Sequence, residues 1–320
     1  TRFVGATSSP TRALFAGGNS PSVDNVIQFV EIATTGDATA FGSLTSLPAV
    51  ADAGGINSPT RAIWTGGDTD GAGNYSEEIQ FVNIASKSDA RDFGDLLTGR
   101  GIAAGLSSAT RGLIGGGAAP SQVNTIEYLT IATFGNSTDF GDCTIARYGR
   151  GSTTDCIRGV FAGGYNPQPS IVDTIEYVTI AQTGNAVDFG DLTVARDAAP
   201  GANATSTRGV FAGGLGPSSQ ANIIDYITIA QTGNADDFGD LITNSRNGGG
   251  FACNQTRGIV AGGRSPVSNT NVIQFITMST LGNSADFGDL TSAMSRGAAC
   301  ANAVRWANAG GRSPDFTDSI

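Results

Sequence analysis

The sequence predicts an all-β fold in which one supersecondary unit is copied around a ring. The first reason is a repeated phrase: an Arg, a short apolar run, Gly-Gly, a strand with Tyr or Phe, and Phe-Gly-Asp. A period of this size indicates one unit copied many times. The second reason is that each copy holds four short β-prone runs, and no window shows the 3.6-residue period of a helix. The arginines that open the copies stand 47 to 50 residues apart, at Arg12, Arg61, Arg111, Arg158, Arg208, Arg257 and Arg305.

The clearest copy justifies the four strands in turn. Residues 198–204 are small, as the crowded centre of a ring requires, and form the expected first strand. A second strand over 209–212 ends at Gly213-Gly214, a pair that allows positive φ or a close backbone approach. Residues 223–230 are β-branched and aromatic, which predicts the third strand. The fourth strand, over 235–241, carries Asp-Phe-Gly-Asp, and its Gly suits a bulge. Four short antiparallel strands are typical of a β-propeller blade.

A ring of such units is one domain, so the whole chain is expected to form a single propeller. Six complete copies and the first two strands of a seventh predict seven blades, the last incomplete; a six-bladed ring with an extra half-repeat is the alternative. Asp318-Ser319-Ile320 matches the start of a third strand, and we expect the chain to be part of a longer protein. The expected repeats span approximately 1–46, 47–98, 99–145, 146–194, 195–243, 244–292 and, in part, 293–320.

Composition narrows the classes of partner. The net charge is −10 and the chain has no His. Nucleic acid requires a basic footprint, so it is not expected as a partner, and an anionic membrane surface would repel the chain. No signal peptide is visible and no apolar stretch has the length of a membrane span, so membrane insertion is not expected. Self-association stays open.

No cofactor or metal ion is expected. The four cysteines lack metal-ligand spacing, and we interpret them as small apolar packing residues rather than a disulfide; they are Cys143, Cys156, Cys253 and Cys300. Asp188 and Asp191, with their counterparts in later copies, invite a calcium interpretation. Two carboxylates per blade are few ligands for calcium, and the first copy lacks both, so we favour turn-capping Asp.

Comparison of the copies separates scaffold from variable positions. The Phe of Phe-Gly-Asp is expected in the core. Each opening Arg is expected to form a hydrogen-bonded tie with the polar residue of the third strand, which is Gln28, Gln80, Glu127, Glu176, Asp225 or Gln274.

The loops between the second and third strands differ in every copy and lie on one face of a propeller. A rigid scaffold with varied loops on one face is how binding surfaces are commonly built, although neutral drift in exposed loops is the alternative. Aromatic residues and Arg are enriched at binding hot spots. The candidate binding face therefore comprises Asp70, Tyr75, Tyr165, Asn166, Arg264 and Arg312.

The order of these motifs resembles the kelch repeat. In one copy it reads Gly163-Gly164, Tyr177, Phe189, Leu192 and Arg196, and the match covers essentially the whole chain. Kelch repeats have Trp where this chain has Phe. The resemblance implies a kelch-like β-propeller. The repeat text also looks like kelch-type repeats in virion proteins of aquatic bacteriophages, especially tail fibres, which implies a location in a virion or outside the cell.

Three functions follow as hypotheses. The first is a non-enzymatic structural or adhesion module of a phage particle, in a tail fibre or associated with the capsid, that binds a host-surface glycan or a neighbouring virion protein. The second is an intracellular kelch-type adaptor for an acidic peptide. The third is a propeller enzyme, which is less favoured. A galactose-oxidase-like site needs His, and Trp64 and Trp306 do not lie in sialidase-like boxes.

Overall fold

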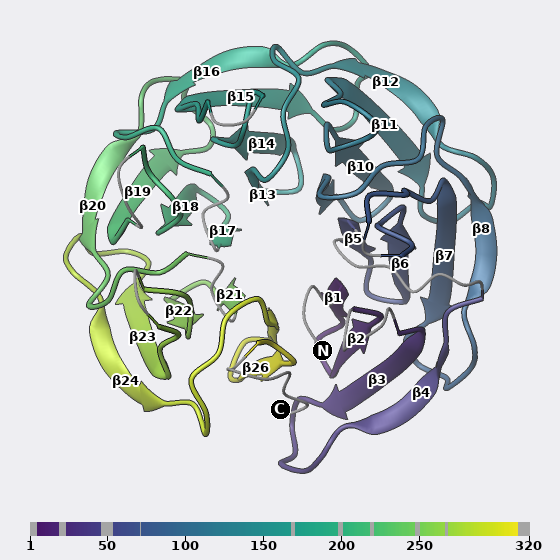
Figure 1. The fold of residues 1–320 in the computed structure, drawn as a ribbon, viewed down its shortest axis with the longest axis horizontal. Coiled ribbons are helices and arrows are strands. Elements are labelled where there is room, and N and C mark those ends of the chain that lie inside the picture. The colour runs from purple at the N-terminus through teal and green to yellow at the C-terminus, as the bar shows by residue number, and fades with distance from the viewer. Residues whose placement is uncertain are drawn as a thin grey trace.

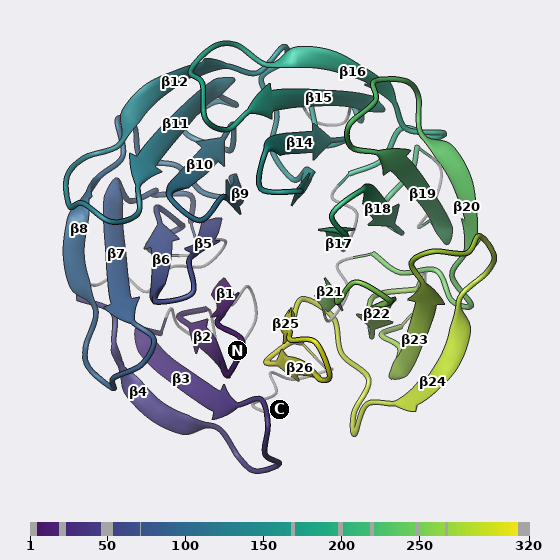
Figure 2. The same cartoon turned by 180° about the vertical axis from the view of Figure 1, so that it is seen from behind.

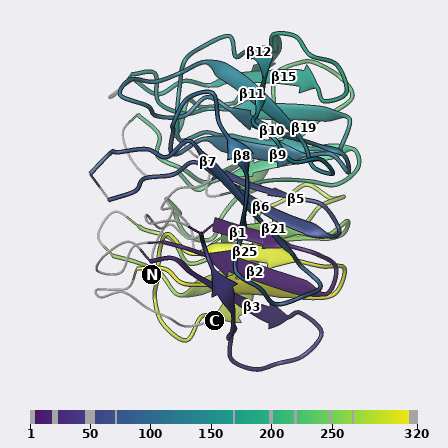
Figure 3. The same cartoon turned by 90° about the vertical axis from the view of Figure 1, so that its right-hand side faces the viewer.

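The computed structural model describes residues 5–18, 24–45, 54–70, 72–167, 170–197, 201–217, 221–246, 250–265 and 268–312. Within these ranges the chain forms β-strands and no helix, and therefore no helix that could cross a membrane. Six four-stranded antiparallel sheets and one two-stranded sheet stand around a ring (Figure 1). Edge-on, the strands run between the two faces of the ring (Figure 3). The β-propeller expected from the repeat is confirmed.

The strands follow the chain from the centre of each blade to its edge. Blade 1 comprises β1 (Gly5–Ser8), β2 (Arg12–Ala16), β3 (Val26–Glu31) and β4 (Thr39–Ser43). Blade 2 comprises β5 (Gly54–Asn57), β6 (Arg61–Thr65), β7 (Glu78–Asn83) and β8 (Arg91–Asp95). Blade 3 comprises β9 (Ala104–Ser107), β10 (Arg111–Gly115), β11 (Thr125–Thr130) and β12 (Thr138–Asp142). Blade 4 comprises β13 (Gly151–Thr154), β14 (Arg158–Ala162), β15 (Thr174–Thr179) and β16 (Val187–Asp191).

The last three sheets continue the same order. Blade 5 comprises β17 (Gly201–Ala204), β18 (Arg208–Ala212), β19 (Ile223–Thr228) and β20 (Asp236–Asp240). Blade 6 comprises β21 (Gly250–Cys253), β22 (Arg257–Ala261), β23 (Val272–Thr277) and β24 (Ala285–Asp289). The seventh sheet, blade 7, comprises β25 (Ala298–Ala301) and β26 (Trp306–Ala309) within the described residues.

The glycines of the repeat have the conformations that the sequence predicts. Gly213 and Gly214 end β18 with φ of 70° and 110°. Gly239 of Phe-Gly-Asp has φ 140°, and the pairing of β19 with β20 shifts register between Ile224 and Asp225. The expected bulge is therefore confirmed, and it bends the outer strand of each complete blade in the same place.

The half-blade closes the ring. β25 packs between β21 and β1, so the innermost strands meet around the whole circle (Figure 2). The Asn302 side chain donates to the Pro10 carbonyl at 2.9 Å, and the Arg305 guanidinium donates to the Ile32 carbonyl at 3.4 Å. Chain segments almost 300 residues apart are thereby joined by the same contacts that join consecutive blades, such as Asn57 to the Ser8 carbonyl.

The apolar core lies between blades. The Phe of Phe-Gly-Asp, which is Phe-Gly-Ser in blade 1, is only 2–4% exposed in blades 1 to 5. It meets the aromatic ring of the third strand edge to face, as Phe189 does with Tyr177 at 5.8 Å between centroids. Burying each such ring contributes about 1.5–3 kcal/mol. The scaffold role expected for this Phe is confirmed in those five blades.

The expected tie between the opening Arg and the polar residue of the third strand is wrong. The opening Arg instead reaches into the next blade. Arg208, for example, donates to the Met278 carbonyl at 2.7 Å while its guanidinium lies over the Tyr226 ring at 4.6 Å. Five further opening arginines have main-chain acceptors, which are Ile84 for Arg12, Ile131 for Arg61, Ile180 for Arg111, Ile229 for Arg158 and Ile32 for Arg305. The planar guanidinium suits this combined stacking and donation.

The polar residue of the third strand binds the preceding blade. Its side-chain oxygen accepts a backbone N–H from the segment that follows Phe-Gly-Asp there, as Glu176 does from Thr144 at 2.7 Å. Where this residue is acidic, the preceding blade supplies a buried Arg seven residues after its Phe. These buried pairs are Arg100 with Glu127, Arg147 with Glu176, and Arg196 with Asp225. In blade 6 the third-strand residue is the neutral Gln274, and the preceding blade has the neutral Ser245 in place of the Arg. The charges of the two positions are therefore matched in each of these copies.

Candidate binding face

The residue after Gly-Gly is held in a fixed frame on one face of the ring. It forms an antiparallel bridge with the connection that leads into its own blade, at Gly101–Ala118, Tyr148–Tyr165, Arg246–Arg264 and Ser295–Arg312. In blade 5 the Asp197 N–H donates to the Leu215 carbonyl at 2.9 Å, and the Leu215 N–H donates to the Asp197 side chain. The backbone is therefore constant while the side chain changes. From blade 2 to blade 7 the residues after Gly-Gly are Asp68, Ala118, Tyr165, Leu215, Arg264 and Arg312.

Blade 4 places an aromatic pair in this frame. Tyr148 and Tyr165 stack with their ring centroids 5.4 Å apart and an interplanar angle of 25°. The Tyr165 N–H donates to the Tyr148 carbonyl at 2.9 Å, which fixes the two residues side by side. Tyr165 is only 8% exposed, so the side chain expected on an exposed loop is largely packed into the face.

A polar network joins this pair to blades 5 and 6. The Arg246 guanidinium donates to the Tyr165 hydroxyl oxygen at 3.2 Å and forms an ion pair with Asp197 at 3.4 Å. The other Asp197 oxygen accepts the Leu215 N–H at 2.6 Å. Burial and the neighbouring Asp197 carboxylate raise the pKa of Tyr165 to about 12, so the phenol keeps its proton. Burial also raises the pKa of Asp197, against the Leu215 N–H and Arg246.

Three arginines continue the face across blades 6 and 7. Arg246 and Arg264 exchange backbone hydrogen bonds of 3.2 and 2.8 Å, and the Asn269 side chain donates to the Arg312 carbonyl. Arg264 and Arg312 are exposed, and the Arg246 side chain is 29% exposed. We call Arg246, Arg264 and Arg312 the cationic arc. It concentrates positive charge on a chain whose net charge is −10.

The remaining predicted residues lie elsewhere on the face. Asp70 is exposed in blade 2, and hydrogen bonds from the Ala72 N–H and the Asn74 side chain lower its pKa. Tyr75 is half-buried and forms a backbone bridge with Asp68. Asn166 follows Tyr165, and its N–H donates to the Ser170 carbonyl at 2.9 Å. The structure thus joins Tyr165 with the cationic arc, while Asp70 and Tyr75 lie in blade 2, with blade 1 between them and the nearest blade of the arc.

Sequence reasoning missed Tyr148, Asp197 and Arg246. All three belong to the connections between blades, whereas the prediction considered only the loops within blades. A signal was present, because Gly101, Tyr148, Asp197, Arg246 and Ser295 recur 47 to 49 residues apart and differ in every copy. Residues that vary at a fixed interval therefore mark both the position after Gly-Gly and its bridge partner in the connection between blades.

The cysteines add no reactive thiolate to the candidate binding face. Cys143 and Cys300 are buried thiols, whereas Cys156 is exposed in a turn with φ 73°, so the packing interpretation is wrong for Cys156. Burial raises the pKa of Cys143, and it raises the pKa of Cys253 to about 11 and that of Cys300 to about 12. These three remain protonated near neutral pH and are poor nucleophiles.

The acidic turns have local hydrogen-bonding roles. The carboxylates of Asp237 and Asp286 accept the N–H of Gly239 and Gly288, at 3.1 and 3.0 Å. Turn capping by the first Asp of the motif is therefore seen in blades 5 and 6. In the described part of the chain, no group of three or more Cys, Asp or Glu side chains could hold a metal ion.

No protein-family model matches the chain, and no curated protein has a significantly similar sequence. Function must therefore be argued from the repeat and from the geometry of this face.

Proposed function

We propose that the chain is a non-enzymatic adhesion module that binds an acidic glycan through the half-buried Tyr148, which the packed Tyr165 supports, and through the cationic arc. The observation that carries the proposal is the stacked tyrosine pair hydrogen-bonded to the first arginine of the arc. Aromatic rings present apolar surface to a sugar ring, and Arg binds a carboxylate with two parallel hydrogen bonds. Together they match a sugar that carries a carboxylate.

The biological setting follows from the repeat. The resemblance to kelch-type repeats of aquatic phage virions supports a place in a tail fibre or a capsid-associated protein, with a host-surface glycan as the ligand. The constant scaffold and changing side chains support recognition rather than catalysis, because each copy supplies one replaceable contact on an otherwise fixed frame.

Titration calorimetry with acidic and matched neutral oligosaccharides tests the proposal. We expect binding of the acidic series only, and a loss of affinity of about tenfold for Arg264→Ala and for Arg312→Ala. Both side chains are exposed, so the melting temperature should not change. Asp70→Ala, in blade 2, is the matched control and should bind as the unmodified protein does. Equal affinity for neutral and acidic sugars would refute the role of the arc.

The same arc favours a second candidate, an acidic segment of a protein. That ligand would be a neighbouring virion protein or, for an intracellular adaptor, an acidic peptide. It predicts binding of acidic peptides with the same dependence on Arg264 and Arg312 and no dependence on the Tyr148–Tyr165 stack. Replacement of Tyr148 by Ala therefore separates the two candidates, because only the glycan needs the aromatic surface.

A further inference from the structure

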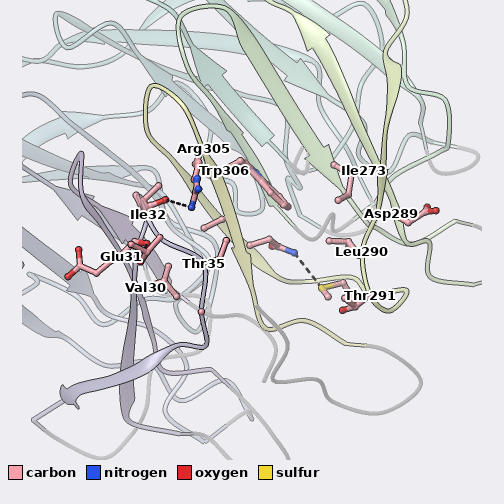
Figure 4. A pocket seen from close by; sticks show the side chains of 15 residues that line it. Val30, Glu31, Ile32, Thr35, Ile273, Asp289, Leu290, Thr291, Arg305 and Trp306 are labelled. Carbon is pink, nitrogen blue, oxygen red and sulfur yellow. Dashed lines mark hydrogen bonds between the residues drawn. The ribbon is translucent and has the colours of Figure 1, made fainter.

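Among the described residues no outer strand stands between β24 and β4. Within the described residues blade 7 ends at β26, which pairs with β25 on one side (Figure 2). Two cavities of about 420 and 280 Å³ lie beside β26. Figure 4 shows the larger cavity, with Trp306 between Val30 and Ile32 of blade 1 and Ile273 and Leu290 of blade 6. Both neighbours thus turn apolar side chains toward the same space.

Residues at the outer edge of blade 6 lack the covering contacts that their counterparts in the other blades have. Phe287 is 53% exposed, whereas its five counterparts are 2–4% exposed. A Cβ added to Gly288 would meet nothing within 4 Å, whereas at Gly141 or Gly190 it would lie 2.4–2.5 Å from the backbone of the next turn. Blade 6 is therefore shaped for a neighbouring turn that the described residues do not supply.

Blade 1 shows the complementary half. Gln28 is exposed, whereas its counterparts from Gln80 to Gln274 are 0–2% exposed. Each counterpart accepts an N–H from the segment after Phe-Gly-Asp of the preceding blade, as Gln274 does from Ile242 at 2.8 Å. The donor for Gln28 would come from a fourth strand in blade 7. Both sides of the opening thus lack contacts that the corresponding residues make elsewhere in the ring.

We propose that this opening is a docking site for a β-hairpin with the sequence pattern of the third and fourth strands of a blade. Its first strand adds to β26 through main-chain hydrogen bonds, as in other cases of strand addition. Its turn covers Phe287 and Gly288, and a main-chain carbonyl accepts the Arg257 guanidinium as Met278 accepts Arg208. This surface is separate from the glycan face and does not rest on it.

The charge pairing defines the polar residue of the hairpin. An acidic residue in the third strand always follows a buried Arg of the preceding blade, whereas Gln274 follows Ser245. Met294 of blade 6 has the position of that Arg and lines the larger cavity. A carboxylate would be buried there without a counter-charge, so the hairpin carries a neutral Gln.

Trp306 defines a second position. The other second strands have Ala or Gly at this place, opposite a Val, Leu or Ile of the third strand; Gly258 opposite Ile276 is an example. Trp306 fills space that this third-strand side chain occupies in other blades. The hairpin therefore has a small residue opposite Trp306. An acceptor nearby would also satisfy the Trp306 indole N–H, which is buried without a partner in the part of the chain described.

A labelled synthetic peptide with the sequence of residues 271–291 tests the proposal by fluorescence anisotropy. We expect saturable binding, tighter binding when the peptide carries Ile276→Ala, and at least tenfold weaker binding when it carries Gln274→Glu. A scrambled peptide is the control. In the protein, Phe287→Ala and Arg257→Ala should each weaken binding about tenfold. Each should lower the melting temperature only slightly, because both side chains are exposed without the peptide and lose only a contact with Phe275.

Three results would overturn the proposal. The first is equal binding of the scrambled peptide. The second is equal binding of the Gln274→Glu peptide, which would show that the site does not select the neutral residue. The third is a dimer in sedimentation experiments that excess peptide does not dissociate, because a second copy of the chain would then cover the opening instead.

Discussion

At the scale of single residues, the buried charges of the interface between blades 3 and 4 decide how the protein responds to acid. Glu176 has no exposed surface and lies 2.8 Å from Arg147 and 3.2 Å from Arg150. Burial raises the pKa of Glu176, but the two guanidinium groups and the Thr144 hydrogen bonds outweigh burial and hold it below its ordinary value. Loss of the carboxylate charge would leave two buried cations without their partner.

Replacing Glu176 with Gln should therefore lower the free energy of unfolding by about 3–5 kcal/mol at pH 7. The folded-state pKa of Glu176 is depressed, so its contribution is present above pH 4.5, the ordinary value, and is lost as the pH falls through the lower folded value. Denaturant titrations from pH 7 to pH 3 should show the difference between variant and unmodified protein shrinking in acid. A constant difference would mean that the charge is not what stabilises the interface.

At the scale of elements, the opening Arg joins consecutive blades, and blade 6 provides an internal control. Arg208 both stacks on Tyr226 and donates to the Met278 carbonyl. Arg257 stacks on Phe275 at 4.7 Å, but no carbonyl among the described residues accepts from its guanidinium. The same residue type thus has a complete tie in one blade and half of it in another.

Arg208→Ala should lower the free energy of unfolding by about 2 kcal/mol, because a charge-assisted hydrogen bond and a cation–π contact are lost. Arg257→Ala should cost less than about 1 kcal/mol, since only the stacking is removed. Paired denaturant melts of the two variants measure the difference. Equal losses would show that stacking on the ring, rather than donation to the next blade, is the stabilising part.

The sequence was a good guide to the strands and a poor guide to their partners. The expected strands over 209–212 and 223–230 correspond to β18 and β19 within a few residues, because period, turn glycines and β-branched runs are local signals. The partner of Arg208 lies 70 residues away at Met278, and the partner of Glu127 is Arg100 in the preceding blade. Such contacts depend on how blades stack, which spacing within one copy does not show.

Only part of the candidate face could be predicted from the sequence, again because contacts between blades are not visible within one copy. Variable residues after Gly-Gly pointed to Tyr165, Arg264 and Arg312, but a repeat pattern carries no information on how deeply a side chain is packed. Tyr165 is buried because Tyr148 stacks on it and Arg246 reaches it from a blade two positions on. Comparing the connections between blades would have marked Tyr148 and Arg246 as variable positions. It would not have shown that both contact Tyr165.

At the scale of the whole molecule, the ring has one weak junction. Within the described residues blades 1 to 6 each have four strands, whereas blade 7 has only β25 and β26 to place against blade 1. The bonds from Asn302 to Pro10 and from Arg305 to Ile32 supply the closure that the outer strands supply elsewhere. Local opening requires little free energy where few apolar contacts are lost, so opening should begin at this junction.

Hydrogen–deuterium exchange should locate that opening. Amides of β25 and β26 should exchange faster than those of β13 and β14, which have the same places in a complete blade. The two pairs of strands have the same position in their blades and differ in the number of outer strands beside them. Once the exchange rates are corrected for the intrinsic rate of each sequence, any remaining difference reflects the missing outer strands. Asn302→Ala should accelerate exchange in β25 and β1 together, because both edges of the junction are released at once. Equal protection of all inner strands would show instead that the ring opens as one cooperative unit and that two strands close it as firmly as four.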